Sequence, residues 1–171
     1  ATVYGKSEHI LGEIGVNKFN VTTKIPYVPP ETKDLIEHVE KLILESLSKI
    51  GLKSFYCVLI HDSKQLSNKD SQEKIFNALK KVKARGLVKK IGVSIYDPIE
   101  LNNINYLSKY DIVQAPFNIL DRRIIKDGWL DKLKKNKISL QVRSIFLQGL
   151  LLMPSELRPK KFSKWNGLWE A

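Results

Sequence analysis

Polar side chains follow one apolar run after another along this 171-residue chain, each at or near the carboxyl end of its run. They are Lys24, His61, Ser94, Gln114 and Arg143. The set combines titratable groups with hydrogen-bond donors and acceptors, which suits proton transfer and the binding of a polar ligand. We predict no metal site, because three scattered His and one Cys offer no metal-ligand spacing.

The apolar runs alternate with segments of helical periodicity. We expect strands at 19–25, 55–61, 89–95, 110–117 and 138–146. We expect helices from about Ser7, over Leu35 to Leu47, over Ile75 to Val82 with Asp70 or Ser71 as its cap, from Asp97 to Leu107, and over Trp129 to Lys135. This spacing demands parallel βαβ crossovers, so the predicted class is α/β, with about five parallel strands and intervening helices.

Two architectures fit this order of elements: an open five-stranded sheet, or part of a (β/α)8 TIM barrel. Periodicity does not separate them. An open sheet concentrates its ligand groups at one switch point, whereas a barrel spreads them over the carboxyl ends of successive strands. The even distribution of polar residues over the strands favours the barrel.

The composition is that of a globular protein, with 43% hydrophobic and 27% charged residues. No apolar run approaches the roughly 18 residues of a membrane span, and no signal peptide is visible. The single Cys57 lies within the apolar run FYCVLI, where we expect a small core residue rather than a nucleophile. These features predict a cytoplasmic protein without a membrane partner.

The formal net charge is +11, which is typical of proteins that bind nucleic acid or an anionic small molecule such as a dinucleotide phosphate. The basic runs KKVKARGLVKK and DKLKKNK are also typical of helix ends, where cations suit the helix dipole. No RNA- or DNA-binding motif accompanies the charge. We therefore favour solvated helix ends and expect no specific nucleic-acid partner.

Six blocks in register, spread over nearly the whole chain, resemble the aldo-keto reductases, in particular bacterial members of that superfamily. The blocks are VYGKSEHILGE, FNVTTKI, VLIHD, IGVSIYDP, VQAPFNILDRR and SIFLQGLLL. The resemblance implies a (β/α)8 barrel that reduces small-molecule carbonyl substrates, aldehydes or ketones, to alcohols. It also implies a nicotinamide cofactor, usually NADPH, bound without a glycine-rich GxGxxG motif.

The resemblance assigns a catalytic role to three residues. Tyr4 matches the proton-donating tyrosine, Lys24 its lysine partner and His61 the histidine that orients the carbonyl. Hydride delivered to a carbonyl carbon leaves negative charge on oxygen, which needs a proton and nearby donors. A phenol has a pKa of about 10, and a nearby cation brings that pKa closer to working pH. Taken singly, Tyr4 is also typical of an ordinary aromatic residue in a loop, Lys24 of a charge at the end of a strand, and His61 of a histidine in the core.

The resemblance also assigns cofactor contacts. Ser94 and Gln114 match residues that hydrogen-bond the nicotinamide carboxamide, although many members have Asn where this chain has Ile95. Arg143 stands where many members carry an aromatic that stacks on the nicotinamide. Its planar guanidinium can do the same, or it can form an ion pair inside the barrel mouth; both readings stay open.

Residues further along the chain complete these assignments. Gln148 and Leu150 align with a loop that borders the cofactor pyrophosphate in the family. Tyr96, Trp129 and Trp165 are expected to be packing residues rather than substrate contacts.

The family motif Asp-Thr-Ala-x-x-Tyr-Gly begins two residues before Ala1, so the catalytic Asp lies outside the sequence. The chain resembles family strands three to seven, and we expect residues 1–171 to be a single incomplete barrel domain, inactive by itself. Its open sheet edges predict either self-association or a longer biological protein. The alternative is a non-catalytic α/β module that self-associates or binds anionic partners through its basic helices.

Overall fold

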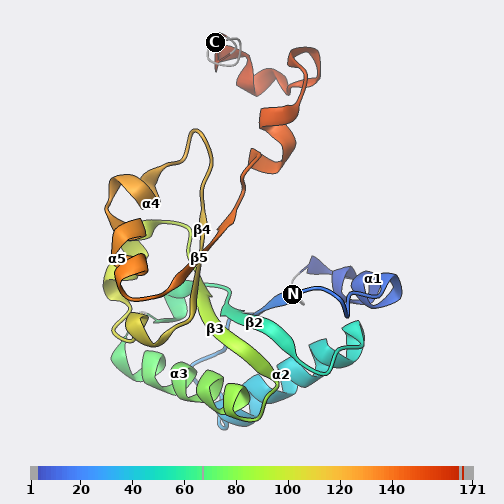
Figure 1. Ribbon diagram of the computed structural model, residues 1–171, viewed down its shortest axis with the longest axis vertical. Coiled ribbons are helices and arrows are strands. Elements are labelled where there is room, and N and C mark those ends of the chain that lie inside the picture. Colours follow the sequence, from blue (N-terminus) through green and yellow to red (C-terminus); the bar gives the residue numbers. More distant parts are fainter. Residues whose placement is uncertain (1–3, 67, 166, 168–171) are drawn as a thin grey trace.

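A computed structural model describes residues 4–66, 68–165 and 167 of the chain. The motif residue Ala1 lies outside this described part. Five strands form one parallel sheet (Figure 1). The strands are β1 (Thr22–Ile25), β2 (Phe55–Ile60), β3 (Val88–Ser94), β4 (Ile112–Pro116) and β5 (Ser139–Arg143).

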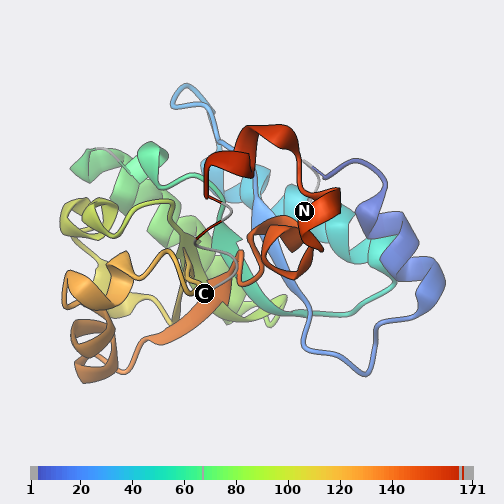
Figure 2. The same cartoon turned by 90° about the horizontal axis from the view of Figure 1, so that it is seen from above.

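The strand order distinguishes the two architectures that the sequence leaves open. The five strands lie in the order β1-β2-β3-β4-β5, and every neighbouring pair is parallel. A doubly wound sheet reverses its strand order at a switch point, and the described sheet has no such reversal. Seen from above, the strands follow the chain around a curve, as in an arc of a barrel (Figure 2).

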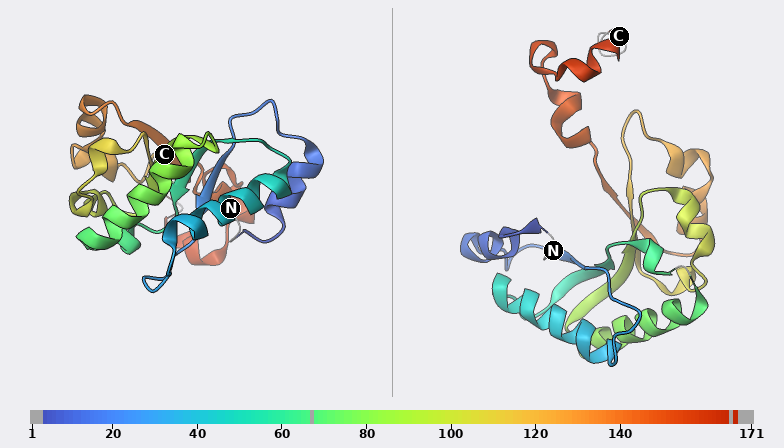
Figure 3. Two further views of the ribbon diagram at one scale, coloured as in Figure 1. Left: turned by 90° about the horizontal axis from the view of Figure 1, so that it is seen from below. Right: turned by 180° about the vertical axis from the view of Figure 1, so that it is seen from behind.

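Helices cover the outer face of this curve (Figure 3). They are α1 (Ser7–Ile14), α2 (Leu35–Ile50), α3 (Lys69–Ala84), α4 (Arg123–Lys126) and α5 (Trp129–Lys135). The Asp34 side chain accepts a hydrogen bond from Glu37 N at the start of α2, and Gly51 ends that helix in the left-handed conformation, with φ of 73°. Lys81 and Lys83 of the first basic run lie in the last turn of α3, and Lys132, Lys134 and Lys135 of the second lie in the last turn of α5, as predicted. Lys89 and Lys90 of the first run belong instead to β3.

The core lies between the helices and the sheet. Phe55, Val58 and Ile60 of β2 pack with Ile43 of α2 and Leu79 of α3, all at most 1% exposed. Successive side chains of a strand point to opposite faces, so Cys57 and Leu59, which alternate with Val58 and Ile60, face the inside of the curve. There Cys57 and Leu59 form a separate small cluster with Ile112. The central strands are therefore buried on both faces.

The helix predicted from Asp97 to Leu107 is wrong. Asp97 does cap the segment, but Pro98–Asn103 and Leu107–Lys109 are short 3-10 turns. The Gln72 side chain donates to Asn103 O at 2.7 Å and accepts from Asn105 N at 2.7 Å. These bonds satisfy the backbone in a non-helical path, which Asn side chains also favour.

Smaller differences concern the bounds and the number of the elements; for example, the strand predicted over 138–146 ends at Arg143. The first strand begins at Thr22, because Phe19 N donates to Val16 O and closes a turn before it. The cap of α3 is Asn68, whose side chain accepts from Ser71 N at 2.9 Å. The four-residue α4 is an addition that the periodicity did not indicate.

The segment that follows β5 extends away from the sheet (Figure 1). It consists of the 3-10 turns Leu147–Leu152, Ser155–Leu157 and Lys160–Trp165, none of which has a buried residue. Over the described ranges, no helix is long and apolar enough to cross a membrane.

Candidate active site

Tyr4, Lys24 and His61 meet at the carboxyl ends of β1 and β2. Tyr4 lies in the turn before α1, Lys24 is the third residue of β1, and His61 directly follows β2, with its backbone N–H bonded to Ile25 O. Tyr4 Oη and His61 Nε2 are 3.5 Å apart, the outer limit of a hydrogen bond. Lys24 Nζ lies 5.9 Å from the centre of the Tyr4 ring. The tertiary structure thus brings these three residues together.

Burial and positive charge act on both titratable partners of Tyr4. Burial, and then the charge of Lys24, lower the pKa of His61 below its usual value of 6.5. Burial, and then the charge of Arg143, lower the pKa of Lys24. His61 is therefore neutral at pH 7, with one ring nitrogen as donor and the other as acceptor.

A row of polar side chains continues along the inner face of the sheet. Ser94, Gln114 and Gln141 occupy paired positions on β3, β4 and β5. Ser94 Oγ donates to Gln114 Oε1 at 3.4 Å, and Gln114 Nε2 donates to Gln141 Oε1 at 3.0 Å. Gln141 was not among the residues predicted from the sequence, although it precedes Arg143 by two residues and therefore shares its strand face.

This row fits a carboxamide ligand. A carboxamide offers one acceptor oxygen and an NH₂ donor, and the two Gln side chains carry the matching donors and acceptors. The link from Ser94 to Gln114 is long, at 3.4 Å, and leaves the Gln114 oxygen able to accept a stronger bond. Ser94 and Gln114 are 1% and 8% exposed, so both polar side chains are buried.

Arg143 is the last residue of β5 and reaches across to the end of β3. Its NH2 group donates to Ile95 O at 3.1 Å, and its Cζ lies 4.5 Å from the centre of the Tyr96 ring. Arg143 forms no ion pair in the described part of the chain. The interpretation of Arg143 as one partner of an ion pair is therefore wrong for these residues. Tyr96 is 56% exposed, so its prediction as a packing residue is also wrong.

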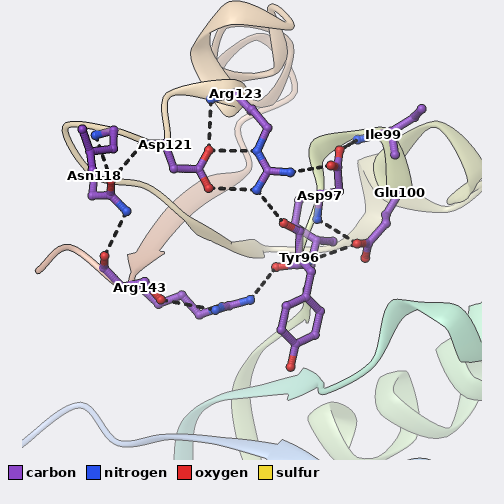
Figure 4. A network of polar contacts seen from close by, with 11 residues as sticks. Tyr96, Asp97, Ile99, Glu100, Asn118, Asp121, Arg123 and Arg143 are labelled. Atoms are coloured by element: carbon purple, nitrogen blue, oxygen red, sulfur yellow. Dashed lines mark hydrogen bonds and ion pairs between the residues drawn. The ribbon is translucent and has the colours of Figure 1, made fainter. Parts of the chain in front are cut away.

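A second arginine ties the strand-end loops together (Figure 4). Arg123 donates to both carboxylate oxygens of Asp121, at 2.9 and 2.8 Å, and to Tyr96 O at 3.3 Å. It also forms an ion pair with Asp97. The hydrogen bond from Arg123 lowers the pKa of Asp121. The loop after β4 is thereby fixed to the loop after β3.

Asn118 and Glu100 extend this network. Asn118 Nδ2 donates to Ser144 O at 3.2 Å, which joins the loop after β4 to the residue after β5. Glu100 Oε1 accepts from Tyr96 N at 3.1 Å and from Asp97 N at 2.7 Å. Hydrogen bonds among the loops after β3, β4 and β5 therefore fix the backbone around Tyr96 and Arg143. These links between loops were not predicted from the sequence.

The remaining predicted residues lie apart from this row. Gln148 and Leu150 belong to the 3-10 turn after β5, and no described hydrogen bond links either of them to Ser94, Gln114 or Arg143. Their contact with a pyrophosphate stays a prediction. Trp129 packs against the core as expected, whereas Trp165 is 39% exposed and lies near Phe162.

An apolar groove lies outside the candidate site, and the described residues offer no group of metal ligands. An apolar groove of about 630 Å³ is lined by Phe117, Val142 and Phe146 among others. Val142 alternates with Arg143 along β5, so the groove lies on the opposite face of the strand. Among the described residues, no three His, Cys, Asp or Glu side chains are grouped so that they could hold a metal ion.

Sequence comparison identifies a family. Residues 1–167 match the family model described as the aldo/keto reductase family. The curated proteins gave no match to this sequence.

Solved structures share the fold. A glycerol dehydrogenase from Gluconobacter oxydans has 22% identity and a TM-score of 0.67, over 94% of this chain and 52% of that one. The holo form of an aldo-keto reductase from Bacillus halodurans has 18% identity and a TM-score of 0.69, over 86% and 52%. An aldo/keto reductase from Klebsiella pneumoniae, in complex with NADP and acetate, has 14% identity and a TM-score of 0.67, over 94% and 56%.

The chain thus spans about half the length of these relatives. Their similarity and the strand order confirm the predicted partial (β/α)8 TIM barrel.

Proposed function

The chain belongs to the aldo/keto reductase family, and from this premise we propose that it carries the central part of an NADPH-dependent carbonyl reductase. Its substrates would be small aldehydes or ketones, reduced to alcohols. The observation that supports this most is the convergence of Tyr4, Lys24 and His61 beside a row of buried amide and hydroxyl groups.

In this proposal each of the three residues has a separate task. Tyr4 donates the proton that the carbonyl oxygen takes up, since its hydroxyl lies beside His61 at the carboxyl ends of β1 and β2. Lys24 stabilises negative charge on the phenol oxygen through its own positive charge. His61 is neutral at pH 7, so it orients the carbonyl by a hydrogen bond and does not compete as the acid.

The polar row would hold the cofactor. A bound nicotinamide supplies the hydride for such a reduction. Ser94, Gln114 and Gln141 would bind its carboxamide, Arg143 would lie against the ring, and Gln148 and Leu150 would border the pyrophosphate. The choice of NADPH is supported by the Klebsiella relative in complex with NADP.

We further propose that residues 1–171 form one incomplete barrel domain. In the described sheet β1 and β5 are the edge strands. An open edge presents unpaired backbone groups, so a second copy or a longer chain would cover it. A cytoplasmic location and the expected lack of a nucleic-acid partner stay predictions.

The test is a titration of the purified chain with NADPH, followed by cofactor fluorescence. We expect saturable binding that weakens about tenfold in Gln114→Ala, because one buried hydrogen-bonding amide is lost. Asn77→Ala, an exposed amide on α3, is the matched control and should bind like the parent chain. Tyr4→Phe should retain binding, and any carbonyl reduction that the parent shows should be lost.

A parent chain that folds cooperatively but binds no NADPH at near-millimolar concentration would overturn this function. Strongly salt-dependent binding of nucleic acid, without dinucleotide binding, would favour the non-catalytic module instead.

A further inference from the structure

Arg123 and Arg143 lie in the same polar network at the carboxyl ends of the strands, but they differ in their ion-pair partners (Figure 4). Arg123 is paired with the carboxylates of Asp97 and Asp121. Arg143 contacts only neutral groups among the described residues: Ile95 O, Ser144 Oγ and the Tyr96 ring. Arg143 therefore has no ion-pair partner among the described residues at the point where β3 and β5 end, although its charge, after the hydrogen bonds and charge of Arg123, also helps to lower the pKa of Asp121.

The orientation of the Arg143 guanidinium is fixed. Its NH2 group is bonded to Ile95 O, and the Tyr96 ring lies 4.5 Å from its Cζ. Tyr96 is itself held at both backbone ends, since its N–H donates to Glu100 and its carbonyl accepts from Arg123. In addition, Arg143 Nε is buried without a hydrogen-bond partner in the described part of the chain. Such a group is a charged plane held in one orientation.

Building on the proposed cofactor site, we propose that Arg143 determines which oxidation state of the cofactor the chain binds, favouring the reduced over the oxidised nicotinamide. The reduced ring is neutral, and a planar guanidinium stacks on a neutral ring without electrostatic penalty. The oxidised ring is a pyridinium cation, which a nearby guanidinium without an ion-pair partner repels.

The size of this preference follows from the same charges. Two unit charges about 4 Å apart repel each other strongly enough, even in bulk water, to change a binding constant about fivefold, and more where water is partly excluded. Lys24 is a second cation within range of the Arg143 charge, since burial, and then the charge of Arg143, lower its pKa. We therefore expect about a tenfold preference from Arg143. An aromatic side chain at this position would act in the opposite direction, since its π-face attracts cations.

The functional consequence is directional. A site that binds the neutral ring well and the cationic ring poorly loads the reduced cofactor and releases the oxidised one. Arg143 would then act as a specificity-determining residue for reduction rather than for alcohol oxidation.

The experiment measures the dissociation constants of NADPH and NADP⁺ for the full chain by calorimetry and compares their ratio among variants. Arg143→Gln removes the charge, and we expect the ratio of the NADP⁺ constant to the NADPH constant to fall about tenfold. Arg143→Lys keeps the charge but loses the plane, so both forms should bind more weakly while most of the ratio remains. Arg122→Gln, an exposed arginine on the neighbouring loop, loses the same net charge and should leave the ratio unchanged.

A salt series on the parent chain tests the same inference without any substitution. The ratio should decrease as sodium chloride is raised towards about 1 M, where the screening length is about 3 Å. If both forms bind and the ratio is unaffected by Arg143→Gln and by salt, the inference is overturned while the proposed function stands. If the folded parent chain binds neither form, the proposed function fails, and this inference fails with it.

Discussion

The two faces of the sheet differ in chemistry although the same five strands build both. The outer face is apolar and packs against the helices, with residues such as Phe55, Ile43 and Leu79 almost fully buried. Among the described residues, the buried apolar cluster of the inner face consists of Cys57, Leu59 and Ile112, with Tyr56 packed against it.

Towards their carboxyl ends, the inner positions become polar, with Ser94 and Gln114 buried and Gln141 joined to them. Buried polar groups cost stability unless they are hydrogen-bonded. The outer face therefore supplies most of the folding free energy, and the inner face retains polar groups that are available to a ligand.

The largest expected effect is on the outer face. Phe55→Ala removes a fully buried ring and should lower the free energy of unfolding by about 3–5 kcal/mol. Urea unfolding measures this change. Phe19→Ala is the matched control, because Phe19 is 72% exposed and its loss should change stability by less than about 0.5 kcal/mol. Equal costs for the two variants would contradict the view that burial against the helices supplies the folding free energy.

The next effect concerns Gly92, where strands β3 and β4 lie against each other. Gly92 pairs with Ile112, and a Cβ at this position would clash with Ile112 O and lie 2.8 Å from Leu59 Cδ2. Gly92→Ala should therefore cost about 1–3 kcal/mol by forcing β3 and β4 apart. Chemical denaturation gives the stability, and a variant as stable as the parent would show that the inner cluster yields easily.

A smaller effect is expected where charge rather than apolar area joins the outer helices. Arg85, at the end of α3, forms an ion pair with Glu40 of α2, and its side chain is 53% exposed. Arg85→Ala should lower the free energy of unfolding by less than about 1 kcal/mol, because water and salt screen exposed pairs. Thermal unfolding at low and high salt measures this. A loss comparable to that of Phe55→Ala would mean that charges, too, stabilise this face substantially.

The smallest effect is a pH dependence from the inner face. Burial and Lys24 lower the pKa of His61, so the unfolded chain takes up a proton at higher pH than the folded chain. The contribution of His61 is therefore complete above pH 6.5 and is lost as the pH falls through its folded pKa. In His61→Gln, the denaturation midpoint should change less with pH between about pH 7.5 and about pH 5 than it does in the parent chain. His9→Gln, an exposed histidine on α1, should keep the slope of the parent.

The sequence alone determined the repeating elements, because their signals are local. The stripe of α2 and the apolar run of β2 each follow from residue spacing, and both lie where the periodicity predicts them. The region from Asp97 to Leu107 shows the limit of such reasoning. Its apolar spacing is helical, but Gln72, from a different helix, binds its backbone in another conformation.

The candidate site divides in the same way. Motif order indicated Tyr4, Lys24, His61, Ser94, Gln114 and Arg143. Only the tertiary structure joined Gln141 to Gln114, stacked Tyr96 on Arg143, and gave Arg123 two ion-pair partners. These relations depend on strand register and on loops distant in sequence. Local pattern determines which residues a chain can offer, whereas the charge and contacts of each side chain depend on the partners that folding brings to it.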